Sequence, residues 1–419
     1  MVTRCLILHP DIARRDTRRT PQNALAEAVS LAAALELEVV ETFVVRLAKA
    51  QAGLLFGKGK VEEYAQLIED QEIDLVVVDS AVTPIQQRNL EKRWSVKVLD
   101  RTGLILEIFG DRAATREGVL QVDLAALAYQ RSRLVRSWTH LERQRGGLSF
   151  VGGAGETQIE ADRRAIDDAI VRLKRQLAKV VKTRSLHRAA RKKVPFPIVA
   201  LVGYTNAGKS SLFNRLTGAN VMAKDMLFAT LDPTMRAIKL PSGRQIILSD
   251  TVGFISELPT QLVAAFRATL EEVLDADLIV HVRDITHPET EEQAEDVREI
   301  LETLGITRAA HEAMIDVWNK IDQAEPEQKQ ALLAITERDD AIVATSAISG
   351  EGMDKLCDLI DLSLVEPSVT EMLQLEFAEG RKRAWLFDQN VVDTENQTGV
   401  GFDLTVTWTK KQSDQFLLL

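Results

Sequence analysis

The stretch Gly203-Tyr204-Thr205-Asn206-Ala207-Gly208-Lys209-Ser210 has the spacing G-x-x-x-x-G-K-S. It follows the apolar run 198–202 and precedes the helical pattern 211–216. A strand, a glycine loop and a helix N-terminus together cradle phosphates, because backbone N–H groups and the helix dipole point at the anion. We therefore predict that these eight residues bind a nucleotide, with Lys209 on its β- and γ-phosphates and Ser210 holding Mg²⁺.

A second motif, Asp250-Thr251-Val252-Gly253, follows the strand-like run 245–249. An aspartate at this place can hold Mg²⁺ through a water molecule. The backbone N–H of Gly253 can then sense a γ-phosphate. We count Asp250, Thr251, Val252 and Gly253 among the predicted nucleotide-binding residues.

Two further motifs indicate which base is bound. Asn319-Lys320-Ile321-Asp322 follows the strand-like segment 314–318, and Ser346-Ala347-Ile348 follows 341–345. A carboxylate at Asp322 accepts two N–H bonds from the N1/N2 edge of guanine, whereas adenine would leave this charge unpaired. A backbone N–H near Ala347 can meet guanine O6. In this order, the motifs predict a GTP site of the GTPase type.

The segment Phe228-Ala229-Thr230-Leu231-Asp232-Pro233-Thr234 lies where a loop that orders around the γ-phosphate is expected. Thr230 and Thr234 are both candidates for a second Mg²⁺ ligand. Phe254 stands where many small GTPases have a glutamine that orients water, so intrinsic hydrolysis is expected to be slow and completed by a partner. By analogy, the Asn206 amide is a candidate to help hold K⁺ near the phosphates.

Size and composition restrict the class of protein. The chain has 419 residues, of which 45% are hydrophobic and 5% aromatic, and it has only two cysteines, Cys5 and Cys357. These numbers indicate two to four folded domains, no disulfide framework and no zinc site. The sequence shows no signal peptide pattern and no long apolar segment, so we expect a cytoplasmic protein with no stable membrane insertion. Peripheral contact with a membrane stays open.

Charge is unevenly distributed. The net charge is −10, but residues 131–193 carry 17 Lys and Arg against 6 Asp and Glu, a local balance of +11 that leaves −21 on the rest. One basic module on an acidic protein points to a polyanionic partner bound through that module.

The patterning predicts an α/β protein with four parts. Residues 1–120 alternate strand-like and helical segments, which favours a parallel α/β domain; Thr83 is predicted to cap a helix that begins at Pro84. Residues 121–193 read as a basic helical hairpin with a glycine-rich tip at 146–155. Residues 197–367 form the predicted P-loop GTPase domain, a mostly parallel sheet with flanking helices. Residues 368–419 alternate apolar and polar residues and predict a small α+β domain.

Taken together, these motifs resemble the HflX family of GTPases, in the Obg–HflX group. The phosphate loop, the segments 228–234 and 250–254, and the upstream segments 100–106 and 136–144 are all similar to family segments. Gly153-Ala154-Gly155-Glu156-Thr157-Gln158 resembles the family hairpin tip, with Ala154 in place of the usual proline. The resemblance assigns Thr230 to Mg²⁺, nucleotide contacts to Phe228, Ala229, Leu231 and Asp232, and RNA contacts to 153–158.

The resemblance implies a ribosome-associated GTPase that binds the large subunit and splits or rescues stalled ribosomes under stress. The basic residues Arg172, Lys174 and Arg175 are candidate rRNA contacts. Some family members also bind ATP at the N-terminal domain; the spacing of Gly57-Lys58-Gly59-Lys60 matches no phosphate loop and favours a turn before a helix. Two alternatives stay open: an ATP-driven RNA remodeller regulated by GTP, and a signalling GTPase without RNA.

Overall fold

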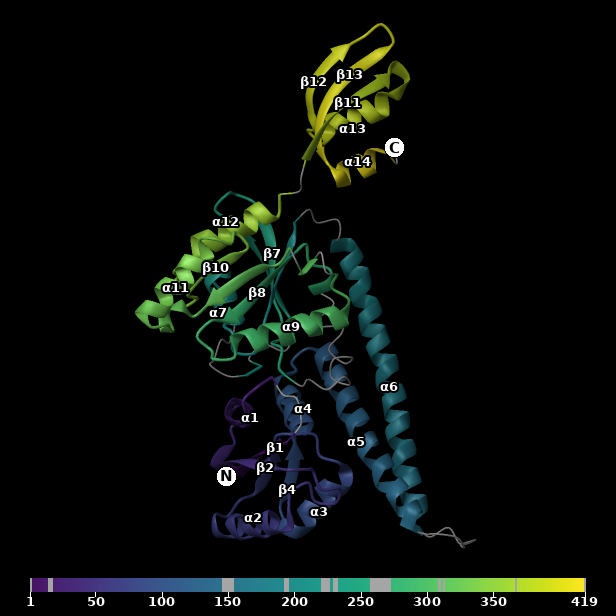
Figure 1. Cartoon of the computed structure of the whole chain (residues 1–419). Helices are drawn as coiled ribbons and strands as arrows, with labels where there is room; N and C mark the ends of the chain where they lie inside the picture. Colours follow the sequence, from purple (N-terminus) through teal and green to yellow (C-terminus); the bar gives the residue numbers. More distant parts are fainter. Residues whose placement is uncertain are drawn as a thin grey trace. The chain divides into compact units, whose positions relative to one another are not determined.

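The computed structural model describes residues 2–13, 18–144, 154–191, 196–219, 227–228, 233–256, 273–307, 310–311, 313–365 and 368–417. Two compact units are present, Met1–Cys357 and Asp358–Leu419. The first contains two sheets and a long helical hairpin (Figure 1). Of the helices in these ranges, none is long and apolar enough to cross a membrane.

The N-terminal domain is built on a parallel sheet with strand order β2-β1-β3-β4. Its strands are β1 (Arg4–Ile12), β2 (Glu38–Leu47), β3 (Leu75–Val78) and β4 (Lys97–Asp100), and its helices are α1 (Pro21–Ala34), α2 (Lys58–Asp70), α3 (Pro84–Trp94) and α4 (Arg101–Arg112). Thr83 caps α3 in a complete capping box with Gln86, as predicted. Gly57 is the N-cap of α2, so Lys58–Lys60 form the first turn of that helix.

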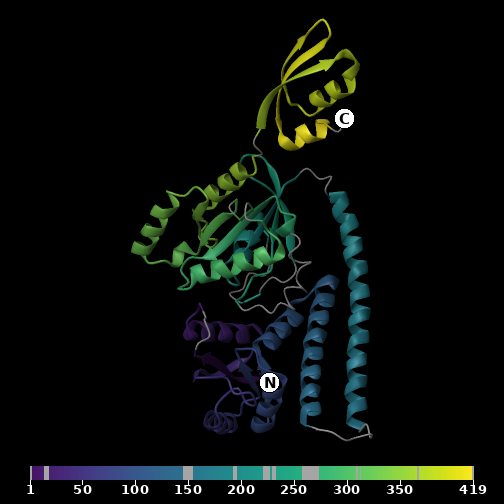
Figure 2. The same cartoon turned by 45° about the vertical axis from the view of Figure 1, so that its right-hand side comes forward.

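The hairpin consists of α5 (Arg116–Gln144) and α6 (Ala154–Arg191), which run side by side in Figures 1 and 2. The predicted glycine-rich tip, 146–155, is too long at one end, because Ala154 and Gly155 already belong to α6, together with Glu156, Thr157 and Gln158. Alanine is the strongest helix former, and Ala154 therefore favours the earlier start. Gly153 lies outside the described residues.

The nucleotide domain has a six-stranded sheet in the order β10-β9-β8-β5-β7-β6, in which only β6 is antiparallel to its neighbour. The strands are β5 (Ile198–Val202), β6 (Thr234–Lys239), β7 (Gln245–Asp250), β8 (Leu278–Asp284), β9 (Ile315–Asn319) and β10 (Ile342–Ala344). The helical elements with described bounds are α7 (Lys209–Thr217), α9 (Thr290–Leu304), η1 (Ile321–Gln323), α11 (Pro326–Thr336) and α12 (Met353–Ser363).

The second unit contains an antiparallel sheet in the order β11-β13-β12. Its elements are β11 (Ser368–Glu376), η2 (Phe377–Glu379), α13 (Gly380–Asp388), β12 (Val392–Gln397), β13 (Gly401–Thr409) and α14 (Lys410–Leu417). Leu386, Leu404, Val406, Trp408 and Phe416 form its core. The predicted fold class, with parallel α/β domains and a small α+β appendage, is confirmed.

Candidate nucleotide site and its relatives

The predicted nucleotide motifs follow the carboxyl ends of parallel strands, which meet at one edge of the sheet. The phosphate loop follows β5, Asp250 ends β7, Asn319 ends β9, and Ser346 comes shortly after β10. This shared edge explains how residues more than a hundred positions apart can line one site.

Asn319 joins three of the motifs directly. Its Nδ2 donates to the Ala207 carbonyl oxygen at 2.9 Å, and its Oδ1 accepts from the Ala347 backbone N–H at 3.1 Å. Gly208 has φ +90°, and a β-carbon there would lie 2.2 Å from Asn319 Nδ2. Only glycine therefore fits at this position of the phosphate loop, which lies against the Asn319 amide.

Lys209, the predicted phosphate-binding lysine, is buried in the loop. Its Nζ donates to the carbonyl oxygens of Gly203 at 3.1 Å and Tyr204 at 2.8 Å. Burial lowers the pKa of Lys209 to about 8, and the nearby Asp250 carboxylate opposes this shift. The ammonium is thus held by the loop backbone at the start of α7, where phosphates are favoured.

The candidate metal ligands Ser210 and Asp250 lie together. The Ser210 hydroxyl donates to Asp250 Oδ2 at 2.6 Å. A hydroxyl and a carboxylate are the oxygen donors that Mg²⁺ prefers, so these residues fit the predicted ion. Thr251 is turned away, because its hydroxyl donates to the Leu201 carbonyl oxygen at 2.7 Å. Ala229, Thr230, Leu231 and Asp232 lie outside the described residues.

The region predicted to read the base is shaped by local contacts. Lys320 has φ +68°, and its Nζ pairs with Asp284 Oδ2 at 2.8 Å; Asp284 ends β8 and belongs to none of the predicted motifs. Asp322 is exposed in η1. The buried Ser346 hydroxyl accepts the Ser349 N–H at 3.0 Å, while Ile348 is exposed. These contacts fix the backbone on both sides of the expected base.

Three further predicted residues, Phe228, Phe254 and Asn206, differ in their burial. Phe228 is buried, and its ring packs edge-on against Phe109 of α4 with centroids 4.6 Å apart. Its side chain therefore belongs to the core between the N-terminal and nucleotide domains. Phe254 is also buried in this core, while Asn206 is exposed with φ +60°. The buried hydrocarbon ring of Phe254 cannot form a hydrogen bond with a water molecule.

Comparisons with known proteins identify the family. The family models that match describe a GTP-binding GTPase N-terminal region over residues 22–110, the middle region over 112–191 and a 50S ribosome-binding GTPase over 198–320. The chain is 52% identical to the GTPase HflX of Magnetococcus marinus over 88% of this chain and 84% of that protein. The chain belongs to the HflX family of GTPases.

A second HflX relative, from Escherichia coli strain K12, is 44% identical over 81% of this chain and 78% of its own length. Among solved structures, a complex of SsGBP with GDP matches 87% of this chain and all of that chain, with 25% identity and a TM-score of 0.50. As an HflX-family GTPase, this chain binds GTP and hydrolyses it to GDP and phosphate, and the resemblance drawn from its motifs is confirmed.

Proposed function

We propose that this HflX-family chain is a GTP-controlled factor that binds the large ribosomal subunit and splits or rescues stalled ribosomes. The GTP site is assigned to the shared sheet edge, and the contact by Asn319 to both Ala207 and Ala347 is the observation that supports it. In this assignment Lys209 binds the β- and γ-phosphates, Asp322 selects guanine and the Gly253 N–H meets the γ-phosphate.

Magnesium is proposed as the cofactor. Ser210 would hold it directly, with Thr230, and Asp250 through water; the ion would neutralise charge on the phosphates during hydrolysis. Lys209 adds a second positive charge from the protein. Because Phe254 cannot orient water, we propose that the ribosome completes the catalytic site. A K⁺ ion near Asn206 is a further candidate to supply positive charge at the phosphates.

The basic hairpin is proposed to contact rRNA. On α6, Arg172, Arg175, Lys179 and Lys182 are exposed and recur at intervals of three and four residues, which places them on one face over roughly 15 Å of helix. Leu173, Leu177 and Val180 are less exposed and lie between them in sequence. A linear row of cations suits the phosphate backbone of RNA. The description of the matching nucleotide-domain family as 50S ribosome-binding supports the same partner.

Sedimentation with purified large subunits tests this proposal. Replacing Arg172, Arg175 and Lys179 of this row by glutamine should weaken binding and reduce the magnitude of the slope of log affinity against log salt by about 2–3, if each residue neutralises one phosphate. The matched control replaces the exposed Lys92, Lys97 and Arg338, which lie outside the hairpin. Equal losses in both triple variants would reject the hairpin as the contact.

Incubation of whole ribosomes with the protein and a non-hydrolysable GTP analogue tests the splitting step. Conversion of whole ribosomes into subunits is the expected result. Binding without dissociation would retain ribosome association and remove splitting, whereas no GTP-dependent association would favour a signalling GTPase. An activity driven by ATP rather than GTP would favour the RNA remodeller. Ribosome association also predicts a cytoplasmic protein.

A further inference from the structure

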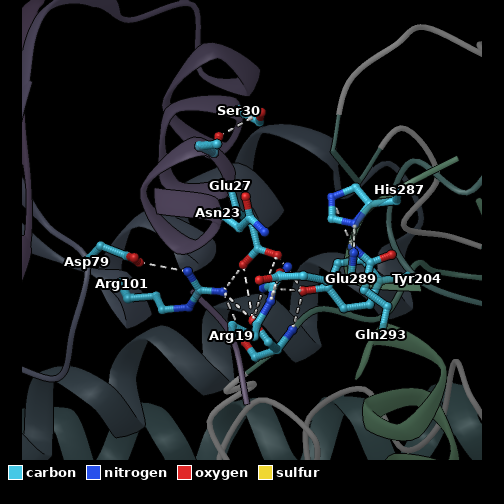
Figure 3. Close-up of polar contacts among 12 residues, drawn as sticks. Arg19, Asn23, Glu27, Ser30, Asp79, Arg101, Tyr204, His287, Glu289 and Gln293 are labelled. Carbon is cyan, nitrogen blue, oxygen red and sulfur yellow. Dashed lines mark hydrogen bonds and ion pairs between the residues drawn. The ribbon is translucent and has the colours of Figure 1, made fainter. Parts of the chain in front are cut away.

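A buried polar cluster links the N-terminal domain to the nucleotide domain (Figure 3). We call it the interdomain cluster and define it by Arg19, Glu27 and Arg101 from the N-terminal domain and Tyr204 and Ser256 from the nucleotide domain. Tyr204 belongs to the phosphate loop, and Ser256 lies three residues after Gly253. The cluster therefore reaches the two segments expected to surround the terminal phosphate.

The Tyr204 hydroxyl uses its full hydrogen-bonding capacity in this cluster. It donates to Glu27 Oε2, and it accepts the Ser256 backbone N–H at 2.8 Å and Arg19 Nη1 at 3.1 Å. A phenol offers one donor and two acceptor positions, so all are occupied. Burial and the neighbouring Glu27 carboxylate raise the pKa of Tyr204, which keeps the hydroxyl protonated as a donor.

Ser256 is held just as completely. Its hydroxyl donates to Glu27 Oε1 at 3.2 Å and accepts from Arg19 Nη1 at 2.7 Å and Arg101 Nη2 at 3.2 Å. Its carbonyl oxygen accepts from Arg101 Nη2 at 3.1 Å. Arg101 is anchored in turn by Asp79, with Nη1 2.7 Å from Oδ1. Figure 3 shows Asp79, Arg101 and Glu27 forming a continuous chain of polar contacts.

The backbone between these two side chains is also tied together. Thr205 N–H donates to the Phe254 carbonyl oxygen at 2.7 Å, and Phe254 N–H donates to the Gly203 carbonyl oxygen at 3.1 Å. A β-carbon on Gly253 would lie 2.8 Å from Thr205 Cα and 3.1 Å from Lys209 Nζ. The segment Gly253–Ser256 thus packs tightly on the phosphate loop, beside the ammonium assigned to the phosphates.

We propose that Glu27 and Arg101 are positioning residues of the N-terminal domain that hold Gly253–Ser256 against the phosphate loop and so weaken the binding of GTP relative to GDP. This inference rests on the proposed role of the Gly253 N–H at the γ-phosphate. A γ-phosphate bound by Lys209 needs room where Gly253 packs on Thr205. A cluster that stabilises the packed arrangement opposes that shift, and a ligand without a γ-phosphate does not require it.

Nucleotide preference measures this role separately from stability. The variants are Ser256→Ala, which removes one hydroxyl, and Glu27→Gln, which removes the charge at nearly constant shape. For each, the dissociation constants of GDP and of a non-hydrolysable GTP analogue are measured on the full chain. Ser256→Ala should shift their ratio about three- to tenfold toward the GTP analogue, with the GDP constant nearly unchanged. Glu27→Gln should shift it at least as far.

Ser30→Ala is the matched control, because its hydroxyl is on the same helix as Glu27 and donates only to the Ala26 carbonyl oxygen of that helix among the contacts described. It should leave both constants unchanged. The double variant Glu27→Gln/Ser256→Ala should shift the ratio by less than the product of the single effects, because both act in one cluster.

Two results would overturn the positioning role. The ratio could stay constant in both variants, as it would if a loss of structure weakened both nucleotides equally, or it could move toward GDP. The proposal for the nucleotide pocket fails in a different way, namely if Lys209→Ala binds GDP as tightly as the parent protein.

Discussion

Replacing Asn319 by alanine is the most direct test of the nucleotide pocket. Asn319 is 1% exposed, and its side chain bonds the phosphate loop, the Ala347 N–H and, more weakly at 3.4 Å, the Thr345 hydroxyl. Asn319→Ala leaves the Ala207 carbonyl oxygen and the Ala347 N–H without this partner. A buried polar group that loses its partner costs about 1–3 kcal/mol, so the two together cost about 2–6 kcal/mol.

The cost should appear mainly in nucleotide binding. Without nucleotide, the loops around Ala207 and Ala347 can relax toward water, whereas a bound guanine nucleotide requires both in place. We therefore expect the lower half of the range, about 2–4 kcal/mol, which corresponds to roughly 30- to 1000-fold weaker binding of both GTP and GDP. Titration with a fluorescent guanine nucleotide measures this loss, and thermal unfolding reports any change in stability.

Asn89→Ala is a matched control. Asn89 Nδ2 donates to the Gly53 carbonyl oxygen at 2.9 Å, the same kind of bond as in Asn319, but within the N-terminal domain. It should lower thermal stability and leave nucleotide affinity unchanged. An Asn319→Ala protein that binds GTP like its parent would refute the reasoning, and so would an equal loss of affinity in Asn89→Ala.

Three further predictions follow from other residues. Asp322→Asn should change base preference from guanine toward xanthine, and competition between GTP and XTP measures it; unchanged preference would reject Asp322 as the base reader. Lys209→Ala should weaken GTP and GDP binding about 10- to 150-fold, because charge-assisted bonds contribute about 1.5–3 kcal/mol; calorimetric titration checks this. Burial raises the pKa of Asp296 to about 6, so its contribution to stability is full below about pH 4 and is lost as pH rises through 6. As pH rises from 4 to 7, the unfolding free energy of Asp296→Asn should therefore increase by about 1–2 kcal/mol relative to that of the parent. Denaturant titrations measure both free energies, and the same dependence on pH in the two proteins would contradict the prediction.

Sequence patterns predicted the parts of this protein that depend on local signals. The apolar run before Gly203 and the cap at Thr83 each act within a few residues, and both gave the observed element. The tip of the hairpin was less predictable, because glycine residues mark a loop but do not fix where the helix resumes. There the helix-forming preference of Ala154 favours a start of α6 before the predicted one.

The interdomain cluster could not be predicted in this way, because its members are distant in sequence and each satisfies another's polar groups only in the folded chain. Glu27 gave one signal: it lies on α1 beside the buried Ala28 and Leu31, where an unpaired carboxylate would be costly. Burial alone would raise the pKa of Glu27, but Arg101 and Arg19 outweigh it, and the pKa is lowered. A charge on an apolar helix face thus predicts a buried partner without identifying it.

The cluster also bears on how a hairpin could respond to a bound nucleotide. Phe109 of α4 packs on Phe228, and α4 is followed by α5 after a short connection, so one helix of the N-terminal domain contacts the nucleotide domain next to the base of the hairpin. Arg101, the first residue of the same helix, holds Ser256. A shift of Gly253–Ser256 must either break these buried contacts or move α4 with it. Breaking them would leave buried polar groups of Ser256 without partners, which costs about 1–3 kcal/mol for each group, so these contacts tie Gly253–Ser256 to α4.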